Sequence, residues 1–350
     1  MKLIGNCTAL GIGSLPDTNA VLALERIFNF FPKIPFWPQL PKRSYFENMY
    51  LQFSEHIPGR CIDIENKRFY IDKTQDLQPE MEGFFNDYLA NDLDKFKISR
   101  DYCEGLYTAL DLAKTKKEIY NGVAFIKGQI TGPISFGLQV VDENKKPIYY
   151  DDMFHDILLK NLQCKARWQE EVLSNINKNI IISVDEPYLS SVGSGVINLN
   201  RAQVIEDIEA IFKVLKKVKA THCCGNTDWS LLMATSADIL LFDAYNYAKN
   251  ISLFTEDLKD FLARGGCLGW GIIPTTGNEL ENCSKEALIL RLEEGIDLLV
   301  KKGLDHETII HQSFITPACG LGNLPIELAN TAMQLTRAVS EHIQAKYNLN

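Results

Sequence analysis

Imidazole and thiol side chains occur together in the stretch Ala220-Thr-His-Cys-Cys-Gly-Asn226. A buried apolar run stops here and a glycine follows, so we expect the stretch to lie at the C-terminal end of a strand. Side chains alternate along a strand, which places His222 and Cys224 on one face and turns Cys223 to the other. Imidazole nitrogen and thiolate sulfur are preferred zinc ligands. The spacing favours a metal site, although cysteines such as Cys223 and Cys267 are also common as small core residues.

Two further candidate ligands follow other apolar runs. Asp243 ends the run 239–243, and Cys319 lies in Thr316-Pro-Ala-Cys-Gly-Leu-Gly322. In a barrel of parallel strands, the C-terminal ends of different strands meet at one mouth, so side chains distant in sequence can share one ion. The chain has no Cys-x-x-Cys knuckle, which a closed structural zinc site typically has. The pattern therefore indicates an open site of the catalytic kind.

Short apolar runs that could position these ligands recur along the chain, with amphipathic stretches between them. Runs that are apolar throughout are typical of parallel strands buried on both faces, and stretches such as 203–218 and 284–302 have helical periodicity. This pattern predicts an α/β fold, a single (β/α)₈ TIM barrel domain over residues 1–350, with an open doubly wound sheet as the alternative. The eight expected strand runs are 8–12, 34–37, 123–131, 180–185, 219–223, 239–243, 267–273 and 308–316.

Two segments are not part of a minimal barrel. The segment 31–50 is rich in proline and aromatic residues, and we expect it to form a stiff N-terminal insertion that covers the C-terminal mouth of the barrel. The segment 60–72 is expected to form a short hairpin. Both are candidate covers for a site.

Composition narrows the class of protein. The 350 residues are 46% apolar and 23% charged, as in a globular protein, and the net charge is −9. An acidic balance without a long run of lysine or arginine argues against nucleic acid or an anionic membrane as a partner. No apolar stretch is long enough to predict a transmembrane helix, and the N-terminus does not have the pattern of a signal peptide. Nine cysteines without a regular framework favour a reducing compartment, so we expect a cytoplasmic protein.

Five ordered motifs resemble the cobalamin-independent methionine synthase family, in particular its C-terminal, core-type barrel. The wider superfamily includes corrinoid-dependent thiol methyltransferases and uroporphyrinogen decarboxylase. The motifs span residues 12 to 322, and five in the same order are far more specific than any one of them. They are Ile12-Gly-Ser-Leu-Pro16, Lys127-Gly-Gln-Ile-Thr-Gly-Pro133, Val184-Asp-Glu-Pro187, His222-Cys-Cys224 and Pro317-Ala-Cys-Gly-Leu321.

The resemblance implies a catalytic zinc ion. His222, Cys224 and Cys319 match the ligands of the family, and Asp243 falls where the family usually has a glutamate ligand. The side chain of aspartate is shorter than that of glutamate, so this chain departs from the family's pattern at the fourth ligand. Zinc binds a thiol as the thiolate, which is the nucleophilic form, so the site would activate a thiol without a dedicated base.

The resemblance also implies where the acceptor binds. Asp185 and Glu186 match the Asp-Glu-Pro that holds an amino acid substrate, with helix capping as the alternative role for such acids. Ser14 matches the loop after the first strand, and its backbone N–H could anchor a substrate carboxylate. In the proline-rich segment, we expect Trp37 to exclude water and Arg43, with its neighbour Lys42, to bind an anionic tail.

These matches predict a zinc-dependent methyltransferase that transfers a methyl group to a small thiol such as homocysteine, giving methionine. The folate-using synthases have two barrels and this chain has length for one. Gly269-Trp-Gly-Ile-Ile-Pro-Thr275 resembles the corrinoid-linked and decarboxylase branches instead. We therefore expect a methylated corrinoid protein as the donor and partner, and methyltetrahydrofolate as a poor donor.

Three other functions stay open at this point. One is the same zinc chemistry with coenzyme M or another thiol as acceptor. The second is a decarboxylase of a porphyrin-like tetraacid, which would need several basic side chains and no metal. The third is a non-catalytic zinc barrel that binds a corrinoid protein or stores metal, because a fold alone does not define a function.

Overall fold

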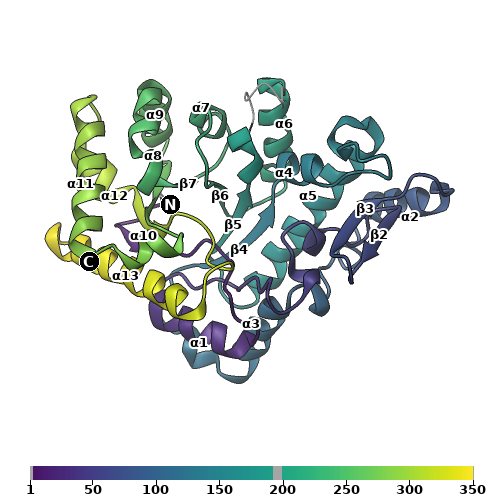
Figure 1. Cartoon of the computed structure of the whole chain (residues 1–350), viewed down its shortest axis with the longest axis horizontal. Coiled ribbons are helices and arrows are strands. Elements are labelled where there is room, and N and C mark those ends of the chain that lie inside the picture. The colour runs from purple at the N-terminus through teal and green to yellow at the C-terminus, as the bar shows by residue number, and fades with distance from the viewer. Residues whose placement is uncertain (1–2, 192–198, 350) are drawn as a thin grey trace.

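A curled sheet of seven parallel strands forms the centre of the molecule, and helices pack around its outer face (Figure 1). A computed structural model describes residues 3–191 and 199–349. The order across the sheet is β1-β9-β8-β7-β6-β5-β4, and a separate two-stranded sheet joins β2 to β3. The strands are β1 (Thr8–Ala9), β2 (Arg60–Asp63), β3 (Arg68–Ile71), β4 (Ile126–Thr131), β5 (Ile180–Asp185), β6 (Val218–Cys223), β7 (Ile239–Phe242), β8 (Cys267–Ile273) and β9 (Ser313–Pro317).

Helices follow most of the strands, as right-handed crossovers between parallel strands require. Helix α5 packs on β4 and β5, and the C-terminal helix α13 packs on β9 and β1. The helices are α1 (Ala20–Phe30), α2 (Gln78–Leu89), α3 (Glu104–Thr115), α4 (Pro133–Gln139), α5 (Asp152–Ser174), α6 (Arg201–Phe212), α7 (Trp229–Met233), α8 (Ala244–Ile251), α9 (Thr255–Ala263), α10 (Gly277–Glu281), α11 (Lys285–Lys301), α12 (His306–His311) and α13 (Ile326–Lys346).

Both faces of the curled sheet are buried, which explains why its strands are apolar throughout. Residues that point outward, such as Leu240 and Trp270, join the large core between sheet and helices. Residues that point inward form a second, smaller core inside the curl. This inner core consists of Leu10, Ile12, Ile34, Ile181, Ala220, Ile239, Leu241, Cys267 and Phe314.

Seven of the eight expected runs contain strands of the main sheet, and the run 34–37 does not. This segment makes single parallel bridges instead, from Phe36 to Lys127 of β4 and from Gln39 to Ser14 beyond β1. Pro35 and Pro38 directly precede the two bridging residues and have no N–H to donate, so a continuous ladder cannot form. The fold is therefore α/β with a curled sheet of seven strands, and a full eight-stranded barrel is not confirmed.

Other expected boundaries needed correction. The run 308–316 was expected to be one strand, but its first residues belong to α12, whose N-terminus is capped by Asp305. Strand β9 begins only at Ser313. The expected hairpin at 60–72 is confirmed as the antiparallel pair β2–β3, which lies beside α2 and away from the main sheet (Figure 1). Among the described helices, none has the length and apolar character needed to cross a membrane.

The proline-rich segment 31–50 packs so close to α3 that the helix has room only for a glycine at the contact. A Cβ at Gly105 of α3 would lie 2.0 Å from the carbonyl oxygen of Pro38. Glycine to alanine in a helix normally stabilises by roughly 0.5–1 kcal/mol, but here we expect Gly105→Ala to destabilise by about 1–3 kcal/mol. Gly83→Ala in α2 is the matched control, because a Cβ there meets nothing within 4 Å, and it should be neutral or stabilising. Urea unfolding of both variants measures the difference, and a Gly105→Ala protein as stable as the control would contradict the close approach.

Candidate metal centre

Three side chains with metal-binding atoms converge at the C-terminal end of the sheet. His222 is the last inward-facing residue of β6, Cys224 follows that strand, and Cys319 lies in the turn after β9. Their ligand atoms all lie within 4.8 Å of one another. Cys223 packs in the outer core instead, as the alternation of side chains along β6 requires. The structure therefore brings together three of the four ligands predicted from the sequence.

The turn that carries Cys319 is tied to the loop after β1. The N–H of Leu321 donates to the carbonyl oxygen of Ser14 at 2.9 Å, and the N–H of Gly322 donates to Ser14 Oγ at 3.2 Å. On the other side, Gly271 of β8 gives the turn room, because a Cβ there would lie 2.8 Å from Cα of Ala318. These contacts hold the Cys319 thiol beside the end of β6.

The two thiols lie close together and differ in acidity. The contact with Cys319, opposed by burial and assisted by His222, lowers the pKa of Cys224 below its ordinary value. The same contact, together with burial, raises the pKa of Cys319 well above its ordinary value. Burial alone would lower the pKa of His222, but the adjacent Cys224 thiolate and the negative charge of Asp185 outweigh it and raise that pKa. The cluster is thus arranged to hold a thiolate and a cation together.

The residues of this cluster fit a zinc ion. Both ring nitrogens of His222 are buried and have no hydrogen-bond partner in the described part of the chain. Unpartnered buried nitrogens are costly, and a metal bound to the ring would remove that cost for one of them. One imidazole and two thiolates are also a donor set that zinc prefers, and three protein ligands leave a position for a substrate.

A cavity of about 280 Å³ opens onto the cluster. Ser14 and Asp185, both predicted from the sequence, line it together with the three ligands. Asp185 is almost fully buried, and its Oδ1 accepts a hydrogen bond of 2.6 Å from Ser183 Oγ. Burial raises the pKa of the Asp185 carboxyl, with Lys127 and His222 acting in the opposite direction. The cavity therefore combines the three candidate metal ligands with a carboxylate in its wall.

Two predicted site residues serve as helix caps in the structure. Asp243 caps α8: its Oδ1 accepts from the N–H of Asn246 at 2.9 Å and its Oδ2 from the side-chain amide of the same residue at 2.8 Å. Glu186 is fully buried and caps α4, accepting from the N–H groups of Ile134 and Ser135 and from the Ser135 hydroxyl. Neither residue belongs to the cluster or lines the cavity.

Two more predicted residues of the proline-rich segment also point elsewhere. Trp37 is fully buried, and its Nε1 donates to Gln169 of α5 at 3.1 Å. Arg43 forms ion pairs with Glu47 at 2.8 Å and Glu104 at 3.7 Å. Trp37 therefore anchors the segment to a helix, and Arg43 is engaged by acids of the protein itself.

The cavity wall includes side chains that the sequence reasoning missed. They come from the later part of the proline-rich segment and are Gln39, Glu47, Asn48, Met49 and Tyr50. Burial raises the pKa of Glu47 to about 7, although its carboxylate accepts from the N–H of Leu40 and from Arg43. The sequence contained one sign of this pair: Glu47 follows Arg43 by four residues within an aromatic stretch, a spacing at which opposite charges often pair.

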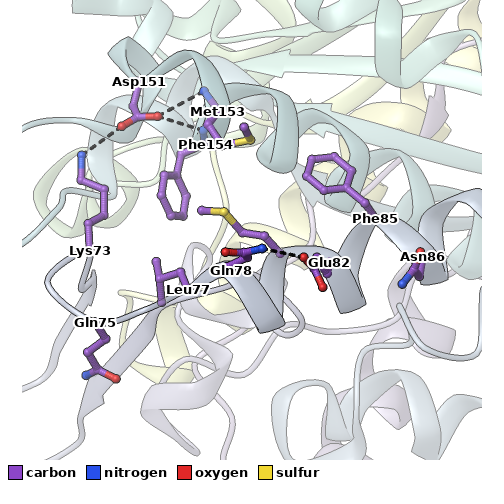
Figure 2. A pocket seen from close by; sticks show the side chains of 11 residues that line it. Lys73, Gln75, Leu77, Gln78, Glu82, Phe85, Asn86, Asp151, Met153 and Phe154 are labelled. Carbon is purple, nitrogen blue, oxygen red and sulfur yellow. Dashed lines mark hydrogen bonds and ion pairs between the residues drawn. The ribbon is translucent and has the colours of Figure 1, made fainter.

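A larger groove lies between α2 and the start of α5 (Figure 2). Its floor is apolar, with Phe85 and Phe154, and its cation Lys73 is paired with Asp151 at 3.0 Å. Among the residues that the structure describes, no cluster of metal-ligating side chains lies there. We therefore take the smaller cavity at the C-terminal end of the sheet as the candidate site.

Comparisons with known proteins test the resemblance that the motifs indicate. No protein-family model matches the chain. A methionine synthase of Methanocaldococcus jannaschii is 29% identical over 220 residues, which cover 62% of this chain and 65% of that protein. The match thus spans slightly less than two thirds of that relative. The resemblance to the methionine synthase family that the motifs indicate is confirmed by this homologue.

Two solved structures are similar in fold. A putative vitamin-B12-independent methionine synthase of Listeria monocytogenes matches 97% of this chain and 99% of its own, with a TM-score of 0.58 and 15% identity. A B12-independent methionine synthase of a Shewanella species, solved in complex with selenomethionine, matches 69% of this chain and 67% of its own, with a TM-score of 0.48 and 16% identity. At these identities, the Listeria protein establishes a shared fold.

One expectation from the sequence is corrected by these comparisons. We expected a methylated corrinoid protein as the partner, because the chain has length for one barrel and because the segment 269–275 resembles the corrinoid-linked and decarboxylase branches. The Listeria protein, which shares the fold over 97% of this chain, is described as independent of vitamin B12, and a corrinoid is a cofactor of the B12 type. Length and this one segment were therefore poor guides to the donor.

The geometry of the cluster predicts that a zinc ion needs both thiols. Cys224→Ser and Cys319→Ser should each lower zinc affinity by more than the roughly 10–100-fold that follows loss of an outer hydrogen-bond partner. Cys223→Ala is the matched control, since this neighbouring thiol lies in the outer core, and it should bind zinc as the wild type does. Competition with a chromogenic chelator measures the affinities. Unchanged zinc binding in Cys319→Ser would show that the site is wrongly assigned.

Proposed function

We propose that this protein is a zinc-dependent methyltransferase that transfers a methyl group to the sulfur of homocysteine, giving methionine. The observation that carries the proposal is the convergence of one imidazole and two thiols beside a buried carboxylate in a single cavity. The sequence relative that is named methionine synthase supports the same reaction class. In this proposal the fold is a (β/α)₈ barrel in one domain, and the segment 31–50 covers its mouth.

His222, Cys224 and Cys319 would hold the zinc ion. When bound, zinc supplies a Lewis acid that keeps the acceptor's sulfur as a thiolate at neutral pH. Asp243 is our candidate for a fourth ligand, and it would have to give up its capping contacts with Asn246 to take that role. The two cysteine ligands contribute negative charge, which keeps the acceptor's sulfur electron-rich.

The charges of the cavity favour an acceptor with an amino group. Asp185 and Glu47 are the acids in its wall, and the described lining contains no lysine or arginine. Lys42, which we expected to bind an anionic tail, donates to the carbonyl oxygen of Leu324 at 2.7 Å, and Arg43 is paired with Glu47. Because Arg43 already pairs with Glu47, Asp185 is the carboxylate that meets a ligand here. A sulfonate such as coenzyme M, or a tetraacid, would be repelled by it, whereas the ammonium of homocysteine would be attracted.

The chain's own residues would orient the acceptor and exclude water. Asp185 would accept hydrogen bonds from the amino group, and the backbone N–H at Ser14 would face the acceptor's carboxylate. Met49 and Tyr50 form the apolar side of the wall and would limit the access of water to the thiolate. The methyl donor in this proposal is a carrier other than a corrinoid protein.

Asp185→Asn tests the role of the carboxylate. The variant should lose a charge-assisted hydrogen bond, so its kcat/KM or affinity for homocysteine should fall by about 1.5–3 kcal/mol. Binding of 4-mercaptobutyrate, which is homocysteine without the amino group, should change little. Calorimetry with the zinc-loaded protein compares the two thiols. Equal losses for both thiols would contradict a contact between Asp185 and the amino group.

A second experiment tests the activation of the thiol. Binding of homocysteine to the zinc-loaded protein near neutral pH should release close to one proton, because the free thiol has a pKa of about 8.5 and binds as the thiolate. Calorimetry in buffers of different ionisation enthalpy counts the protons. Methionine should then form with methyltetrahydrofolate as the corrinoid-free donor, and only in the zinc-loaded protein. Binding without proton release would contradict the thiolate form of the acceptor.

A further inference from the structure

Strand β4 supports the cavity through a row of polar side chains that point into the curled sheet. Lys127, Gln129 and Thr131 occupy alternate positions of β4 and are all buried. Each donates to a backbone carbonyl outside the sheet's regular ladder. Lys127 Nζ donates to the carbonyl oxygen of Ile12, Gln129 Nε2 to that of Trp37 at 3.1 Å and Thr131 Oγ1 to that of Met49 at 2.5 Å. The turn after β1 and the proline-rich segment, which supply these carbonyls, both contribute to the wall of the cavity.

Lys127 is the unusual member of this row. It is one of two lysines that are fully buried among the described residues, the other being Lys165 in α5. An ammonium in the interior is costly unless charge and hydrogen bonds compensate it. Nζ of Lys127 has the carbonyl oxygen of Ile12 and, at 3.4 Å, Oε1 of Gln129 as partners, and it is attracted by Asp185 of the neighbouring strand. The lysine thus connects β4 with the end of β5 and with the turn after β1.

The turn Ile12-Gly13-Ser14, which Lys127 holds through the carbonyl oxygen of Ile12, forms part of the cavity wall. Ile12 and Ser14 both line the cavity, and Gly13 between them packs on Gln129, since a Cβ at Gly13 would lie 2.8 Å from Cδ of Gln129. Ser14 in turn accepts from the N–H groups of Leu321 and Gly322. A shift of Ile12 would therefore move the part of the cavity wall that Ile12 and Ser14 form, whereas the candidate ligand His222 is held by its own strand.

We propose that Lys127 is a positioning residue of the acceptor site, which fixes the turn Ile12-Gly13-Ser14 at the place where the polar tail of the thiol binds. The inference rests on the proposed function. A side chain needed only for packing could be an apolar residue of the same length, without the cost of a buried charge. An ammonium instead offers three donors and a long reach, so that one group can hold the turn, Gln129 and the region of Asp185 together.

The test compares two thiols in the zinc-loaded protein. Homocysteine has the polar tail, and ethanethiol binds through sulfur alone. In Lys127→Met, zinc content should stay as in the wild type, affinity for homocysteine should fall roughly tenfold or more, as for loss of a hydrogen bond to a charged group, and affinity for ethanethiol should be unchanged. Lys165→Met is the matched control, because it removes an equally buried ammonium outside the site, and both affinities should stay as in the wild type.

A double variant asks whether Lys127 acts through the turn. If it does, Lys127→Met should weaken homocysteine binding little further in a Gly13→Ala background, where the new Cβ would meet Gln129 and displace the turn, whereas independent effects would add. Should Lys127→Met fail to fold, Lys127→Gln, which is shorter and uncharged, should give the same selective loss. Wild-type affinity for homocysteine, equal losses for both thiols or full additivity with Gly13→Ala would each overturn the proposal. A wild-type protein that binds neither thiol would overturn the proposed function itself.

Discussion

The parallel pairing of the strands is the constraint on which the site depends. Because β5 and β6 run side by side in register, Asp185 lies opposite His222, and both point inward at the same end of the sheet. The next inward position of β6 falls on Cys224, and the turn after β9 brings in Cys319 from a distant part of the chain. A change of one residue in the register of β6 would replace His222 and Cys224 by Cys223 and a neighbour on the inward face.

The interior of the curled sheet contains an apolar cluster and a set of buried polar side chains. Apolar residues such as Ile181, Leu241 and Phe314 belong to the cluster. Polar residues, among them Lys127 and Ser183, are buried beside them and have hydrogen-bond partners. This arrangement places a carboxylate and a thiolate in a region where charges interact more strongly than in water. The cost of burying them is offset by the opposite charges and hydrogen bonds of the neighbouring polar side chains.

The sequence predicted the regular part of the fold and the cluster well, because both follow a period. Strand alternation was enough to separate Cys224 from Cys223, and ordered motifs pointed to Cys319. The predictions were weaker where no period constrains the side chain. In the segment 31–50, prolines break the ladder, so the inward direction of Glu47 or Tyr50 and the outward direction of Arg43 depend on tertiary contacts. Glu186 could equally have faced the cavity, and only its contacts with α4 show that it is a cap.

The central claim is that these strand ends form a metal centre with a free position for a thiol. Visible absorption of the cobalt(II)-loaded protein during a homocysteine titration tests it most directly. We expect one cobalt per chain, with thiolate-to-cobalt charge-transfer bands from the two cysteines that grow as the sulfur of homocysteine joins them. Cobalt that binds without such bands, or a spectrum that does not respond to homocysteine, would contradict it.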